Sequence, residues 1–201
     1  MRTVKTVLLC LAGAAMLASC GAQEITEKDA MALADSYQPE ETLKKVNHYK
    51  ITGTSETTLA GKTQKKDINE EGILDESNFM TGVVLEDAIS SMKSGGEAAE
   101  SVDLNLGLKF YKNGAKGFKM VAEGADTVAN STSGAKVEYR IKMETAVNDD
   151  GLPSYSNYDI WMKTTMDTSS LGDLGELGTL LNSEMSMKMN STFSYSFVAA
   201  N

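Results

Sequence analysis

The chain has 201 residues, of which 28 are acidic and 19 are basic, so its formal net charge is −9. This length suits one domain, and the acidic balance excludes a nucleic-acid partner because phosphates would be repelled. One histidine and two cysteines are too few for an ordinary imidazole or thiolate metal site, so we expect no metal and no cofactor.

The first 19 residues have the pattern of a secretory signal. Arg2 and Lys5 provide a positive end, and an apolar stretch follows over residues 7 to 17. That stretch is too short for a permanent membrane-spanning helix. It runs into the sequence L-A-S-C at residues 17 to 20, which resembles the lipobox of bacterial lipoproteins.

The lipobox resemblance implies that Cys20 is joined to diacylglycerol and becomes the first residue after cleavage. Acyl chains such as palmitate would then hold the protein on the extracytoplasmic side of a bacterial membrane, in the cell envelope. The alternative is a plain secreted protein with an incidental cysteine. Cys10 would leave with the signal, so the mature domain would have no disulfide. The expected organisation is a signal at 1–19, a lipidated tether at 20–25 and a single domain at 26–201.

Three helical pieces are expected. Thr26 is a suitable N-cap for the first helix, with acidic residues in the next turn. Pro39 opens a second short piece that extends to Val46. A third helix is expected from Val83 to Met92, where apolar residues recur at helical spacing before a Ser-Gly-Gly stop.

The rest of the chain alternates apolar and polar side chains with a period of two, which is typical of strands with one dry face. Strands are expected at residues 49–59, 62–68, 102–110, 118–122, 137–147, 158–166 and 185–197. Asn113-Gly114 and residues 148–151 are turn signals, whereas 125–134 reads as a loop or a weak edge strand and 70–80 stays open. Residues 171–181 combine a helical leucine pattern with glycines, which favours a mobile flap.

The apolar face of such a sheet must pack against another element, and only the expected helices can supply one. We therefore expect an α+β fold in which helices pack on the apolar face of a curved, half-barrel-like antiparallel sheet. The order of elements over residues 26–201, and the strand opening at residues 49–53 (Y-K-I-T-G), resemble the LolA/LolB half-barrel and the mycobacterial LppX and LprG carriers. That resemblance implies an apolar concave face that holds acyl chains. The chain departs from the family in its many methionines and in the leucine-glycine segment.

The candidate ligand-binding residues are the apolar members of the alternating strands, which would line such a cavity. They are Leu104, Leu106, Leu108, Tyr139, Ile141, Met143, Ile160, Met162, Met185, Met187, Met189 and Phe193. The methionine row at 185–189 also suits Cu(I), although a flexible apolar filling explains it equally well. No nucleophile elbow or other catalytic motif is present, so no catalytic residue is assigned and the chain is not expected to be an enzyme.

Two functions therefore compete. The first is a non-enzymatic lipoprotein that binds a lipid or other amphiphile under the sheet. The second is a structural or interaction lipoprotein of the envelope, with a filled core and a protein partner of unknown identity. They differ in cavity volume, since a binding site needs several hundred Å³ and a packed core leaves almost none. A hydrolase is a third possibility without a visible nucleophile-base pair.

Overall fold

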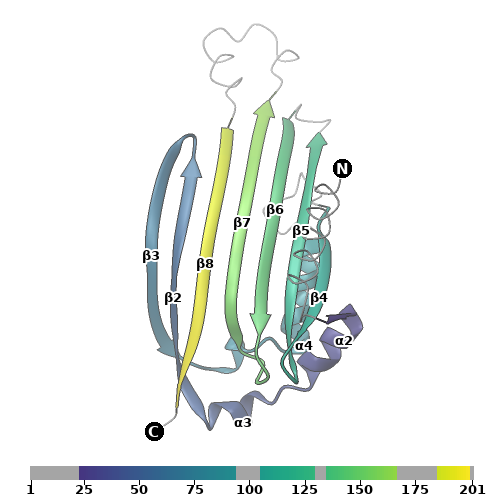
Figure 1. The fold of residues 1–201 in the computed structure, drawn as a ribbon, viewed down its shortest axis with the longest axis vertical. Coiled ribbons are helices and arrows are strands. Elements are labelled where there is room, and N and C mark those ends of the chain that lie inside the picture. Colours follow the sequence, from purple (N-terminus) through teal and green to yellow (C-terminus); the bar gives the residue numbers. More distant parts are fainter. Residues whose placement is uncertain (1–22, 94–104, 130–134, 167–184, 200–201) are drawn as a thin grey trace, which may run out of the picture.

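The computed structural model describes residues 23–93, 105–129, 135–166 and 185–199 (Figure 1). Within them, eight strands form one antiparallel sheet in the order β1-β4-β5-β6-β7-β8-β2-β3. The strands are β1 (Glu24–Ile25), β2 (Val46–Leu59), β3 (Lys62–Ile73), β4 (Gly107–Asn113), β5 (Gly117–Ala129), β6 (Ala135–Val147), β7 (Pro153–Met166) and β8 (Met185–Ala199). The sheet is open, with β1 and β3 at its two edges in the part of the chain described.

Short helices accompany the sheet. They are α2 (Glu27–Asp35), α3 (Pro39–Leu43), the 3-10 helix η1 (Glu76–Asn78) and α4 (Gly82–Lys93). A capping box begins α2: the Asp29 N–H donates to Thr26 Oγ1 at 3.1 Å, and the Thr26 N–H donates back to the Asp29 carboxylate at 3.1 Å. The expected N-cap at Thr26 is therefore confirmed.

Strand register divides the side chains between two faces. On β6, Ile141 lies opposite Gly124 of β5 and Ile160 of β7, so these residues share one face of the sheet. Their sequence neighbours, such as Lys142 and Asp159, share the other face. We call the first the apolar face and the second the polar face.

Helices α2 and α4 pack on the apolar face at its β4–β5 end, where Figure 1 shows α4 behind these strands. The buried core there joins both helices to strands β4, β5 and β6. Its members are Ala30, Ala34, Tyr37, Leu85, Ile89, Phe110, Phe118, Met120 and Val147. Leu85 and Phe118 have no exposed surface, and the rings of Phe110 and Phe118 meet at 6.4 Å between centroids. This end of the sheet is completely packed.

A second, smaller core closes the lower end of β2 and β8. Leu74, Phe79 and Leu152 are buried there, and Tyr49 and Phe197 pack against them. The Met80 N–H donates to the Gly151 carbonyl at 2.8 Å, which ties the segment after η1 to the β6–β7 turn. The long loop between β3 and α4 is thereby held against the sheet.

The expected α+β fold, with helices packed on one face of an antiparallel sheet, is confirmed. Most element boundaries differ from expectation by a few residues, and the short elements β1 and η1 were not expected. β3 continues to Ile73 and α3 ends at Leu43, and residues 125–129, expected as a loop or a weak edge strand, belong to β5 inside the sheet. These residues pair with 136–140 of β6, so a neighbouring strand supplies backbone hydrogen bonds that composition alone does not reveal.

Several expectations lie outside the described residues: the signal, Cys20, Leu104 and the segment 171–181. Of the expected tether, Glu24 and Ile25 form β1 and pair with Tyr111 and Phe110, so part of it belongs to the sheet. Among the described helices, none combines the length and apolar character needed to span a bilayer.

Asp149 joins two hairpin ends. Its Oδ1 accepts hydrogen bonds from the N–H groups of Lys116 and Gly117, both at 2.8 Å, so the β6–β7 turn fastens the β4–β5 turn. Gly114 permits this approach, since its φ is +87° and a Cβ there would lie 2.5 Å from Asp149 Oδ1. The backbone hydrogen bonds hold the pKa of Asp149 below its ordinary value.

Replacing Asp149 with alanine should lower the free energy of unfolding by about 1–2 kcal/mol, because the Gly117 N–H is buried and would lose its acceptor. The pKa of Asp149 is lower in the folded chain, so its contribution is complete above about pH 4 and fades as the pH falls through the folded value. Urea unfolding at pH 7 and pH 3 measures both effects. Asp150→Ala, in the same turn, is the control and should cost little. Equal losses for both variants would contradict the assigned role.

Candidate functional site

Part of the apolar face is not covered by the helices. We define the open face as the ten apolar side chains on the apolar face of β6, β7, β8, β2 and β3 that, among the described residues, are half-buried and belong to neither core cluster. They are Ile51, Ile68, Met143, Tyr158, Ile160, Met162, Met187, Met189, Phe193 and Tyr195. They come from five adjacent strands, β6-β7-β8-β2-β3.

Cross-strand pairing brings these side chains into rows. Met162 of β7 lies opposite Met187 of β8, and the next row sets Ile160 opposite Met189. Directly paired residues in antiparallel strands have neighbouring side chains, so each row is a continuous apolar contact. Thioether side chains rearrange easily, which suits a surface that meets more than one apolar shape.

A pocket of about 290 Å³ lies on the open face. Ile51, Ile68, Tyr158, Phe193 and Tyr195 line it, together with the carboxylate side chain of Glu70 at its β3 side. Tyr158 and Phe193 meet edge to face, with centroids 5.9 Å apart and planes at 71°. The volume is at the lower end of the range for small-molecule sites, so the pocket suits one end of a ligand that extends along the face.

A band of hydroxyl groups crosses the apolar face beside this pocket. Ser55 and Ser191 share a hydrogen bond of 2.8 Å, and Thr145 and Ser156 share one of 3.1 Å. Burial raises the pKa of the Tyr195 phenol, and a hydrogen bond with Ser156 opposes that rise. Ser156 and Ser191 are almost fully buried and Ser55 is half-buried, and all three hydroxyls have hydrogen-bond partners, so the band interrupts the apolar surface without requiring a ligand.

The twelve sequence-predicted residues divide between the open face and its covered border. Met143, Ile160, Met162, Met187, Met189 and Phe193 belong to the open face. Leu106, Leu108, Tyr139 and Ile141 belong to the border, where Tyr139 and Ile141 are buried and Leu108 packs on the main core. Leu104 and the side chain of Met185 lie outside the described residues.

The border is closed by the segment just before β4. The Asn105 N–H donates to the Tyr139 hydroxyl at 2.8 Å. A Cβ on Gly124 would lie 2.5 Å from the Asn105 carbonyl and 2.9 Å from the Leu106 side chain, so glycine lets this segment reach the sheet. Residues 105 and 106 therefore lie at the Tyr139 end of this border.

Four open-face residues are absent from the sequence-predicted set: Ile51, Ile68, Tyr158 and Tyr195. Ile51, Tyr158 and Tyr195 continue the same period-two alternation, so the signal was present in their strands. Ile68 stands between charged and polar neighbours, and only its pairing with Gly53 assigns it to the apolar face.

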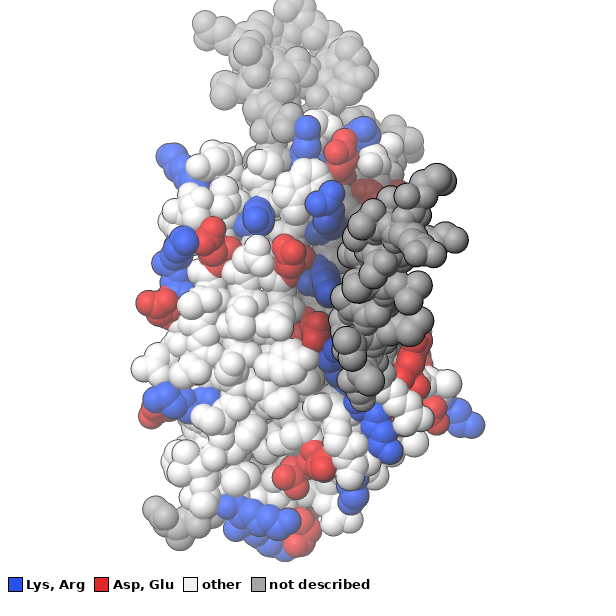
Figure 2. Space-filling model, in the orientation of Figure 1, with Lys and Arg blue, Asp and Glu red and all other residues white. Residues whose placement is uncertain are grey.

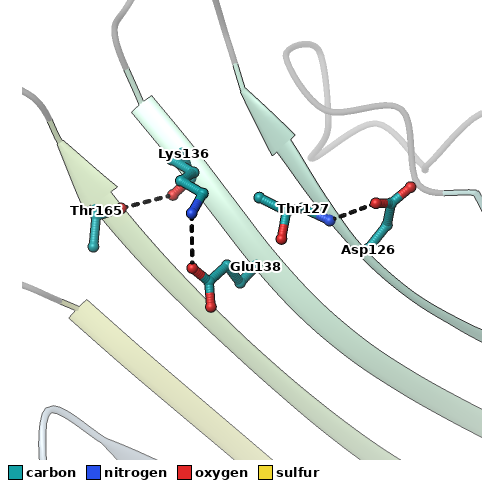
Figure 3. A network of polar contacts seen from close by, with 5 residues as sticks. All are labelled: Asp126, Thr127, Lys136, Glu138 and Thr165. Atoms are coloured by element: carbon teal, nitrogen blue, oxygen red, sulfur yellow. Dashed lines mark hydrogen bonds and ion pairs between the residues drawn. The ribbon is translucent and has the colours of Figure 1, made fainter.

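The polar face carries charges of both signs. Cross-strand ion pairs join Lys65 to Glu56 at 2.7 Å and Lys119 to Glu144 at 3.4 Å. Figure 2 shows basic and acidic groups interspersed, with uncharged surface between them. At the beginning of β6, the Lys136 ammonium contacts the Glu138 carboxylate, and the Lys136 carbonyl accepts a hydrogen bond from the Thr165 hydroxyl (Figure 3). Mixed and solvent-exposed charges of this kind serve solubility and register more than the recognition of an ion.

Other candidate sites are weaker. A depression of about 440 Å³ beside α3 is lined by Gln38, Pro39 and three glutamates. His48 is exposed in β2, and its Nδ1 lies 2.7 Å from Asn47 Oδ1. Among the described residues, no group of three or more histidine, cysteine or acidic side chains could hold a metal ion. The open face is therefore the best-developed candidate.

Comparison with known proteins finds no matching family model, no similar curated protein and no similar solved structure. Any function for this chain therefore has to be argued from its own residues.

Two methionines test whether the open face is really unfilled. Met120 is 6% exposed beneath the helices, whereas Met189 is half-buried on the open face. Met120→Ala should lower the free energy of unfolding by about 3 kcal/mol, and Met189→Ala by about 1 kcal/mol or less, because only the first leaves a closed cavity. Chemical denaturation measures both. Equal, large losses would show that Met189 is enclosed in solution.

Proposed function

We propose that this chain is a membrane-anchored bacterial lipoprotein, without enzymatic activity, that binds a lipid or other amphiphile on the open face. The observation that carries the proposal is a row of half-exposed apolar side chains across five strands, which the described helices leave uncovered. Half-exposed apolar side chains gathered on one face mark a site of interaction, since leaving them in water is unfavourable.

The shape of the face favours an elongated apolar ligand. Four strand spacings from β6 to β3 give it a width of about 19 Å. Each methylene group of an acyl chain laid along it contributes about 0.8 kcal/mol when it leaves water. The pocket beside Tyr158 and Phe193 would receive one end of such a chain, and the hydroxyl of Ser55 stands near enough to the surface to meet an ester or alcohol group.

The anchor would keep the body close to its supply of lipid. Cys20 is four residues before Glu24, where β1 begins, so the connecting chain spans at most about 14 Å when fully extended. β1 pairs with β4, beside the core that α2 and α4 close. The acyl chains on Cys20 would therefore hold the packed end of the sheet near the membrane surface.

A structural or interaction lipoprotein, whose open face is covered by a protein partner, is the alternative. The buried core beneath α2 and α4 supports it, because this end of the fold is filled by its own side chains. A partner protein and an acyl chain would meet the same side chains, so only a direct lipid-binding measurement separates the two functions.

Lipid binding can be measured in membranes that contain the full chain, with a photoactivatable phospholipid as the probe. We expect labelling of the open face, and Ile160→Asp should reduce it about tenfold or more because a carboxylate there would be desolvated by the ligand. Thr192→Asp on the polar face of β8 is the matched control and should label normally. Phe193→Ala, which removes a pocket wall without adding charge, should also reduce labelling. Circular dichroism checks folding.

Equal labelling of Ile160→Asp and Thr192→Asp would refute a lipid site on this face. A protein crosslinked in place of lipid would establish the alternative function.

The anchor has its own test. Cells that produce the full chain should incorporate labelled palmitate into it, and Cys20→Ser should abolish that labelling and leave the chain uncleaved. Cys10→Ser is the control, since this cysteine precedes the expected cleavage point. Labelling that survives Cys20→Ser, or that is absent from the natural chain, would refute the lipoprotein assignment. Neither result bears on ligand binding at the open face.

A further inference from the structure

Strand β3 forms an edge of the sheet. It runs for 12 residues, pairs with β2 along its whole length, and has no strand on its other side among the described residues (Figure 1). Edge strands present unpaired N–H and C=O groups that can pair with another strand, and charged side chains usually discourage this. β3 is rich in charges, and two basic residues on one side of Ile68 are matched by two acidic residues on the other side.

Backbone direction determines which residues of β3 can pair outward. The Leu74 N–H donates to the Asn47 carbonyl, so Leu74 and every second residue before it point their backbone groups toward β2. The intervening residues, from Ile73 back to Thr63, point theirs away from the sheet. A partner strand must therefore match outward-pointing residues with outward-pointing residues.

Four of the six charged residues of β3 are arranged antisymmetrically about Ile68, while Asp67 would face the neutral Asn69. Lys65 and Lys66 precede Ile68, and Glu70 and Glu71 follow it at the same distances. A two-fold axis through Ile68 places Lys66 of one copy opposite Glu70 of the other, and Lys65 opposite Glu71. It also sets outward-pointing residues opposite one another, as the backbone requires.

Neighbouring registers are unfavourable. Moving the axis to Asp67 places two copies of that carboxylate opposite each other, and moving it to Asn69 places Asp67 opposite Glu71. An axis through Lys66 sets two ammonium groups together. Like charges directly opposite on antiparallel strands are destabilising, so the register through Ile68 stands apart from its neighbours.

Existing ion pairs would extend across this junction. On the polar face, Lys65 already contacts Glu56 at 2.7 Å, and Glu71 contacts Lys50 at 2.8 Å. Pairing two copies would join these into a row of four alternating charges. On the apolar face, Lys66 and Glu70 make no ion pair among the described residues, so both are available to the second copy.

We infer that β3 is a self-complementary edge through which two copies of this chain join, antiparallel about Ile68, into one continuous sheet. The axis is perpendicular to the sheet, so the two open faces lie on the same side and meet at Ile68. Ile68 and Glu70 also line the pocket, so the pockets of the two copies become neighbours. The pairing itself does not depend on what the open face binds.

Charge reversal tests the register. Sedimentation velocity of the full chain in nonionic detergent should show a dimer, and Lys66→Glu or Glu70→Lys should each weaken dimerisation about tenfold or more. The double variant Lys66→Glu/Glu70→Lys restores opposite charges and should restore the dimer. A chain that stays monomeric, or a dimer that ignores both single reversals, would overturn the proposal.

A cysteine on the axis supplies a second test that needs no charge change. Ile68→Cys should form a disulfide-linked dimer in cells, since facing residues in a non-hydrogen-bonded pair have Cα atoms about 4.5 Å apart. Gln64→Cys is the control, because it would face Gly72 and lie about 27 Å from its own copy. The unmodified chain sets the background from Cys10 and Cys20. Crosslinking at Gln64 but not Ile68, or of Ile68 to a different protein, would reject self-pairing in this register.

Discussion

A sheet with one apolar face must remove that face from water, and this requirement governs the whole molecule. Helices α2 and α4 meet it at the β4–β5 end, where Leu85 and Phe118 are fully buried. Across the remaining five strands, the described helices leave ten apolar side chains half-exposed. The described part of the structure thus combines a packed end with an end whose apolar side chains its helices leave half-exposed.

The packed end owes its rigidity to contacts between turns as well as to its core. The Tyr37 hydroxyl donates to the Lys116 carbonyl at 2.9 Å, and Asp149 accepts from the backbone of the same hairpin. The end of α2 and two hairpin turns are thereby fixed to one another. The methionine rows lie toward the opposite ends of the strands, where the Ala60 N–H of the β2–β3 turn donates to the Ser186 carbonyl of β8 at 3.1 Å.

The free edge and the open face are physically related. Lys66 and Glu70 stand on the apolar side of β3, beside Ile68 and the pocket, so the edge that could receive a second strand also borders the candidate ligand site. Charged side chains there keep the edge soluble in a single copy. Their antisymmetric order gives the same charges a second use, because it favours one partner strand and one register.

Much of this protein could be predicted from the period-two alternation of its sequence. Alternation placed Met143, Ile160 and Met189 on one face, because side-chain direction in a strand is a local property of the backbone. The capping residue Thr26 and the glycine turn at 114 are equally local. The N-terminal sequence L-A-S-C likewise predicts a lipid anchor from four adjacent residues, and it stays a prediction.

Which apolar residues are covered was decided by tertiary structure. Tyr139 and Ile160 have the same pattern in the sequence, yet the segment at Asn105 buries the first and leaves the second half-exposed. Ile68 joined the open face only through its register with β2, and residues 125–129 became a strand only because β6 lies beside them. Alternation predicts the direction of each side chain. Burial depends on contacts between residues distant in sequence, and no local pattern contains that information.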